Sequence, residues 1–162
     1  METVRDILES PRDTDFRKIE KALAAQDDRC EEAEVALSAL ILRRRTQGRN
    51  GLFDAFTNAD CVQRIDVLAT HLEELGAGEA AAAIRQVQQK LPAQEALTPG
   101  VILELFDENP ELYRLVQELD DAFGEIDAAI ESFLLDCPEQ VLDAETEGTK
   151  GWPLARLRGL FS

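Results

Sequence analysis

Apolar residues recur at spacings of three and four along almost the whole chain, and β-branched runs are scarce. This period places one apolar face on each of a series of amphipathic helices. Alternation typical of a strand never extends beyond a few residues. The pattern therefore predicts an all-α fold, a compact multi-helix domain that spans residues 1–162.

Start and stop signals divide the first part of the chain into three helices. Pro11 ends the first, and Asp15 is a candidate cap for the second. Asp28 and Glu31 have the capping-box spacing expected at the start of the third. The predicted buried positions are Val4, Ile7, Leu8, Phe16, Ile19, Leu23, Ala33, Leu37, Leu40 and Ile41.

The rest of the chain repeats these signals. Asp60 is the expected cap of a helix that Gly76 ends, and an alanine-rich helix comes next at 78–91. Thr98 begins another, and Asn109 caps the last, a single long helix over 110–136. The apolar stripe of this last helix comprises Leu112, Leu115, Val116, Leu119, Phe123, Ile126, Ile130, Phe133 and Leu134.

Charge is distributed very unevenly. The net charge is −16, and residues 101–147, the acidic segment, hold 15 Asp and Glu against one base, Arg114. Few of these acids have the basic neighbour at i+4 that an ordinary helix surface supplies. Acidic surfaces also serve solubility alone, but this segregation favours binding of a basic partner and argues against direct binding of nucleic acid. The candidate partner-binding acids are Glu111, Glu118, Asp120, Asp121, Glu125, Asp127, Glu131 and Asp136.

The stretch GRNGLFDAFTNAD, residues 48–60, forms a corner between two helices. Asn50 and Gly51 both tolerate positive φ and predict a chain reversal. Phe53 and Phe56 anchor it to the core, and Asn58 caps the next helix or bonds the turn backbone. A structural plug is the favoured interpretation, and a ligand site is the alternative.

The same stretch carries a resemblance. Three stretches are similar to the motifs of a bacterial family of acidic helical domains that resemble DNA mimics. In chain order they are NGLFDAFTN, LEELGAGEAAAAI and LVQELDDAFGEIDAAIESFL. At one position the chain departs from the family's motif, because Leu52 stands where that family has a second glycine. The similarity covers residues from about 35 to 140 and leaves 148–162 as a tail. It implies a cytoplasmic, dimer-forming, non-enzymatic regulator that occupies the DNA-binding face of a protein such as a helix-turn-helix transcription factor.

Two other functional classes remain open. His71 and Glu74 could supply two metal ligands to a small metal-binding enzyme or hydrolase, although an isolated pair of this kind is typical of an ordinary surface. An immunity-like adaptor could use the same acids on another partner. We expect no catalytic residues, metal or cofactor, because none of the familiar motifs is present. The charged N-terminus and the lack of a long apolar run predict a cytoplasmic protein that does not bind membranes.

Overall fold

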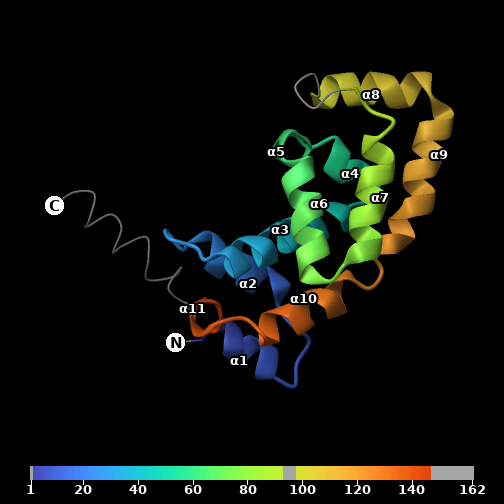
Figure 1. Cartoon of the computed structure of the whole chain (residues 1–162). Coiled ribbons are helices and arrows are strands. Elements are labelled where there is room, and N and C mark those ends of the chain that lie inside the picture. The colour runs from blue at the N-terminus through green and yellow to red at the C-terminus, as the bar shows by residue number, and fades with distance from the viewer. Residues whose placement is uncertain (1, 93–97, 147–162) are drawn as a thin grey trace.

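The computed structural model describes residues 2–92 and 98–146. Over these residues the chain forms eleven α-helices and one 3₁₀ helix, with no strand, so the predicted all-α fold is confirmed (Figure 1). In order they are α1 (Val4–Glu9), α2 (Phe16–Ala24), α3 (Glu31–Thr46), α4 (Leu52–Phe56), α5 (Ala59–Gln63), α6 (Ile65–Leu75), α7 (Gly78–Gln88), α8 (Pro99–Glu108), α9 (Pro110–Leu119), η2 (Asp120–Phe123), α10 (Ile126–Leu135) and α11 (Glu139–Leu142).

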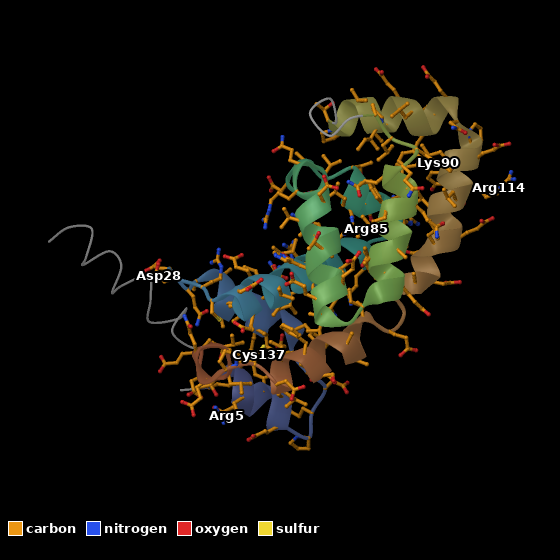
Figure 2. The ribbon with its side chains drawn as sticks, viewed as in Figure 1. Arg5, Asp28, Arg85, Lys90, Arg114 and Cys137 are labelled. Carbon is orange, nitrogen blue, oxygen red and sulfur yellow. The ribbon has the colours of Figure 1, made fainter. Side chains whose placement is uncertain are left out.

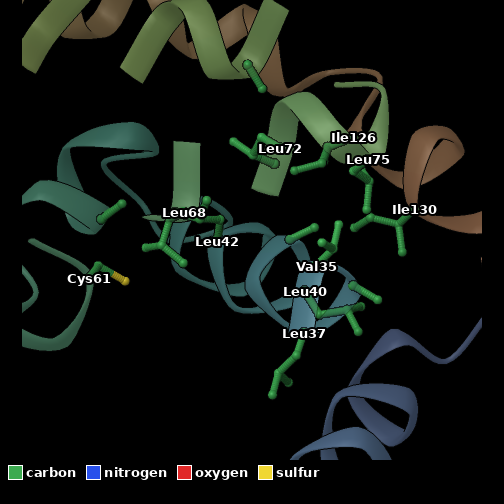
Figure 3. Packing of buried hydrophobic residues seen from close by; sticks show 14 of the residues in the cluster. Val35, Leu37, Leu40, Leu42, Cys61, Leu68, Leu72, Leu75, Ile126 and Ile130 are labelled. Atoms are coloured by element: carbon green, nitrogen blue, oxygen red, sulfur yellow. The ribbon is translucent and has the colours of Figure 1, made fainter. Parts of the chain in front are cut away.

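Helix α3 is the centre of the molecule. It packs against α2, α4, α6, α10 and η2, and side chains on all its faces are buried, including Val35, Leu40 and Leu42. Figure 3 shows these side chains in one buried cluster with Leu72 of α6 and Ile130 of α10. The sequence predicted only one buried stripe on this helix. A central helix is apolar all round because neighbours cover every side of it.

Most predicted helix ends are confirmed. The side chain of Asp15 accepts a hydrogen bond from the Lys18 N–H, and Thr98 and Asn109 cap α8 and α9 in the same way. Gly76 ends α6 with φ of 96°, the left-handed conformation that glycine adopts without strain.

Two predicted caps are wrong. Helix α3 begins after Cys30 with no side-chain cap, so Asp28 does not form the expected capping box. Asp60 lies inside the short helix α5, whose cap is Asn58. In both cases the spacing between the acid and the apolar stripe fits more than one starting residue for the helix. Tertiary packing determines which residue begins it.

The single long helix predicted for 110–136 is also wrong. Helix α9 ends at Leu119, the chain tightens into η2, and α10 begins at Ile126 with a new direction (Figure 1). Gly124 and the Asp120-Asp121 pair are weak helix formers, and the Asp120 carboxylate is engaged by the backbone of the corner. The apolar stripe persists through the break, since Val116, Phe123 and Ile130 are all buried.

Helices α8, α9 and α10 surround the α6-α7 pair. Figure 1 shows α8 across the ends of α7 and α9. In the same view α9 runs beside α7, and α10 lies below α6 and α7. The end of the described acidic segment returns to the start of the chain, where the Val4 N–H donates to the Ala144 carbonyl (3.0 Å) and the Thr146 N–H donates to that of Glu2 (2.9 Å). The end of the described acidic segment is therefore attached to the start of the chain.

Candidate functional site: the acidic segment and its corner

The corner at residues 48–60 is a joint between α3 and the acidic segment. Gly51 has φ of 55°, and the next N–H, that of Leu52, donates to Oδ1 of Asp120 at 2.8 Å. Asp54 accepts hydrogen bonds from the backbone and side-chain amide of Asn50. The predicted chain reversal thus has a partner that the local sequence did not reveal, a carboxylate from a residue far along the chain.

Aromatic rings fasten the other side of the corner. Phe53 packs edge-on against Phe106 of α8 and Tyr113 of α9, with ring centroids 4.8 and 5.2 Å away. Phe56 is completely buried, and Asn58 accepts from the Cys61 N–H at 3.1 Å to cap α5. These contacts support the interpretation of the corner as a structural plug that positions α8 and α9.

The structure distributes the predicted partner-binding acids over three successive elements, α9, η2 and α10, and the residues that flank them. Asp120, Asp127 and Glu131 are half-buried, whereas the other five candidates, Glu111, Glu118, Asp121, Glu125 and Asp136, are exposed. Glu104, Asp107 and Glu108 on α8 are exposed as well. Because of the break at η2, Glu118, Asp121 and Glu125 do not share one stripe of a straight helix.

Two predicted acids are occupied inside the molecule. Asp120 holds the corner backbone, and Asp127 forms an ion pair with Arg43 at 2.6 Å. Arg43 also lies over the ring of Phe16, 4.2 Å from its centroid. Asp120 and Asp127 are therefore better explained as structural residues than as partner-binding residues.

Most other acids of the segment lack a cationic partner. Between Glu104 and Glu145, only Asp127 and Asp143 form ion pairs among the described residues, the second with Arg5 at 3.0 Å. The single base, Arg114, is exposed and points away from the body in Figure 2. The acidic segment thus presents a surface of largely uncompensated carboxylates.

Three of these acids lie where helix physics disfavours them. Glu108 is the last residue of α8, Glu118 lies in the last turn of α9, and Asp136 is the C-cap of α10. The last turns of these helices contain no basic residue, whereas α3 ends with Arg43, Arg44 and Arg45. Negative charge at a helix C-terminus opposes the macrodipole. The dipole of the helix that each acid ends therefore does not account for these positions.

His71 has a structural neighbour. Its Nδ1 lies 2.6 Å from Oγ of Ser38 on α3, within hydrogen-bond distance. In the described ranges 2–92 and 98–146, no three His, Cys, Asp or Glu side chains are grouped as metal ligands would be. The contact with Ser38 gives His71 a packing role between α3 and α6.

Comparison with known proteins adds no functional assignment. No protein-family model, curated protein or solved structure matches this chain. None of the described helices is long and apolar enough to cross a membrane. The tail at 148–162 lies outside the described residues.

Proposed function

We propose that this protein is a non-enzymatic acidic regulator that binds the basic surface of a DNA-binding protein. Its carboxylates would occupy the place of DNA phosphates, in line with the motif resemblance of residues 48–60 and the helices after them. The observation that carries the proposal is the set of exposed carboxylates between Glu104 and Glu145 that have no cationic partner within the described residues.

The spacing of the carboxylates along a helix determines whether one helix is enough to mimic a duplex. A duplex carries one charge per ~1.7 Å of axis, whereas α9, about 15 Å long at 1.5 Å per residue, carries only Glu111 and Glu118. One helix is therefore too sparse. The acidic segment is divided at Asn109 and at η2 into the short helices α8, α9 and α10, so mimicry would need carboxylates from more than one of them.

The electrostatics favour a basic protein partner. Each exposed pair contributes only ~1 kcal/mol or less, but a field of one sign accelerates the encounter with an opposite surface and penalises wrong partners. A complex held in this way weakens steeply as ionic strength rises.

Elution from immobilised duplex DNA tests the proposal. Lysate proteins bound to the duplex at low salt would be eluted by the acidic protein at constant ionic strength and identified. We expect a defined DNA-binding protein to elute with the wild-type chain, and elution to fail when Glu118, Asp121 and Glu125 are all changed to lysine. Circular dichroism would verify that the variant retains its helices.

A matched triple controls for net charge. Glu9, Asp13 and Glu74 are exposed, lie outside the acidic segment and have no ion pair among the described residues, so their reversal to lysine changes the charge equally. A specific acidic face predicts nearly normal elution by this control. Equal loss with both triples would show that only the overall field acts, and the proposal would be wrong.

A further inference from the structure

A cavity of about 250 Å³ between α3, α5 and α6 differs in charge from the rest of the protein. Arg44, Arg45 and Arg64 line it, and Asp60 is the one acid among its lining residues. The whole chain has a net charge of −16. Three guanidinium groups around one cavity therefore form a local basic site in a strongly acidic protein.

The arginines at the end of α3 have different partners. Arg43 pairs with Asp127, and Arg44 pairs with Glu20 at 3.0 Å. Arg45 has no ion pair among the described residues, and its Nε is buried without a hydrogen-bond partner. A buried donor without a hydrogen-bond partner lowers the free energy of unfolding by about 1–3 kcal/mol. An acceptor for the guanidinium of Arg45 would therefore be stabilising.

The opposite wall supplies further donors. Arg64 is exposed and has no ion pair within the described residues. Asn58 uses its Oδ1 to cap α5, which leaves its amide NH₂ group to donate elsewhere. Guanidinium groups bind planar or tetrahedral oxyanions through pairs of parallel N–H bonds. Two arginines and an amide thus provide the donor set that a phosphate prefers.

We propose that this cavity binds a small phosphate-type oxyanion, free or as a small phosphomonoester, between Arg45 and Arg64. The volume is that of about eight water molecules at ~30 Å³ each, which leaves room for a short organic group beside the phosphate. Glu20 already offsets the charge of Arg44, so Arg45 and Arg64 provide the main attraction and Asp60 opposes it. This inference is independent of the proposed role of the acidic segment.

The cysteine in the cavity wall serves as a reporter rather than a nucleophile. Burial raises the pKa of the Cys61 thiol above its ordinary value, although the nearby Arg45 acts in the opposite direction. The side chain of Cys61 is buried, so iodoacetamide reaches the thiol only when the cavity wall opens. A bound anion would disfavour this opening and place negative charge beside the thiol, and both effects slow alkylation. Cys30 precedes α3 at the end opposite Arg45, about 22 Å from it at 1.5 Å per residue, and is an internal control.

The experiment measures alkylation of each cysteine by iodoacetamide, with mass spectrometry of the peptides. Inorganic phosphate and glycerol 3-phosphate are compared at millimolar concentration with sodium chloride of equal ionic strength. We expect a several-fold slower reaction of Cys61 and no change at Cys30. Protection by both phosphates indicates a site for the free ion, and protection by the ester alone indicates a site for the phosphomonoester. A rate at Cys61 that is the same in chloride and in both phosphates would overturn the proposal.

Variants locate the site. Arg45→Gln and Arg64→Gln should abolish protection, while Asp60→Asn should strengthen it. Arg49→Gln removes the same charge from an exposed turn residue that does not line the cavity and should leave protection intact. Arg64 is exposed, so its variant decides the matter if Arg45→Gln does not fold. Equal protection in Arg64→Gln and Arg49→Gln would refute the assignment.

Discussion

Phe56 and Phe53 show how two side chains of one short helix join the central core to the acidic segment. The ring of Phe56 is fully buried, and its neighbour in the same short helix, Phe53, is only half-buried against Phe106 and Tyr113. One ring therefore belongs to the central core and the other to the contact with α8 and α9. Both come from a sequence of five residues, Leu52–Phe56.

Replacement of Phe56 by alanine should lower the free energy of unfolding by ~3–5 kcal/mol, because a large buried ring leaves a cavity that the core cannot fully close. Urea denaturation of both proteins measures the difference. Phe53→Ala should cost clearly less. An unchanged midpoint for Phe56→Ala would mean that the corner lies on the surface.

Cys137 gives a second prediction at the scale of a residue. Burial raises the pKa of this thiol to about 11, and its Sγ donates a hydrogen bond to the Phe133 carbonyl at 3.3 Å, which only the protonated form can do. Well below pH 9.0 the thiol is neutral in both the folded and the unfolded chain. Between pH 9.0 and about 11 the unfolded thiol ionises first, so stability falls as pH rises through this window.

The variant Cys137→Ser keeps a donor without titrating in this range. Between pH 8 and pH 11, the free energy of unfolding of the wild type should fall by up to ~2 kcal/mol more than that of Cys137→Ser. Urea denaturation at several pH values measures both. Other groups titrate there too, so the difference between the two proteins is the relevant quantity. Parallel pH profiles would contradict the assignment.

At the scale of elements, the break at η2 and the corner depend on one another. The Leu52 N–H bonds to Asp120, and a Cβ added at Gly51 would lie 2.6 Å from Cγ of the same side chain. The short carboxylate fits only because position 51 has no side chain. Contact between the two segments thus fixes both the turn and the end of α9.

A double-mutant cycle measures this dependence. Gly51→Ala should destabilise by ~1–3 kcal/mol from backbone strain alone, and the clash with Asp120 adds to that cost. Asp120→Ala should cost ~1–3 kcal/mol, because the Leu52 N–H loses its acceptor. With Asp120 already replaced, Gly51→Ala should cost less than in the wild type. Strictly additive effects in urea denaturation would show that the two residues are not coupled.

The sequence predicted those elements whose signals are local. The caps Asp15, Thr98 and Asn109 and the stop at Gly76 could be found because each signal lies within a few residues of the helix end that it determines. The break in 110–136 could not, since its apolar stripe continues through the break and its main determinant, Asp120, bonds a backbone group 68 residues away. The candidate partner-binding acids were likewise predictable only where the signal is local. The exposure of Glu118 follows from the helical pattern, but the internal roles of Asp120 and Asp127 depend on tertiary contacts.

At the scale of the whole molecule, the acidic face is relevant to self-association. We propose a homodimer, because the carboxylates of one chain are sparse beside a duplex and the family resemblance implies a pair. Analytical ultracentrifugation should give a mass near twice 18.0 kDa at micromolar concentration. A strict monomer at tens of micromolar would count against the dimer and would require mimicry by a single chain.

The acids at the helix ends give the last prediction, which separates stability from function. Glu108, Glu118 and Asp136 each place a negative charge at a helix C-terminus without a cationic partner in the described residues. Changing each to its amide should raise the free energy of unfolding at low salt by ~0.3–1 kcal/mol, because an unfavourable interaction with the macrodipole is removed.

Glu111 is the matched control, because it lies in the first turn of α9, where negative charge is favourable, so Glu111→Gln should destabilise slightly. Urea denaturation at low and high salt measures both effects, and salt should reduce them. If the three amide variants are more stable and also elute less DNA-binding protein from the duplex, these acids lower stability and contribute to recognition. If they are more stable and elute normally, recognition lies elsewhere on the acidic segment. A loss of stability in all three would mean that these carboxylates have stabilising contacts and that their positions do not point to a role in recognition.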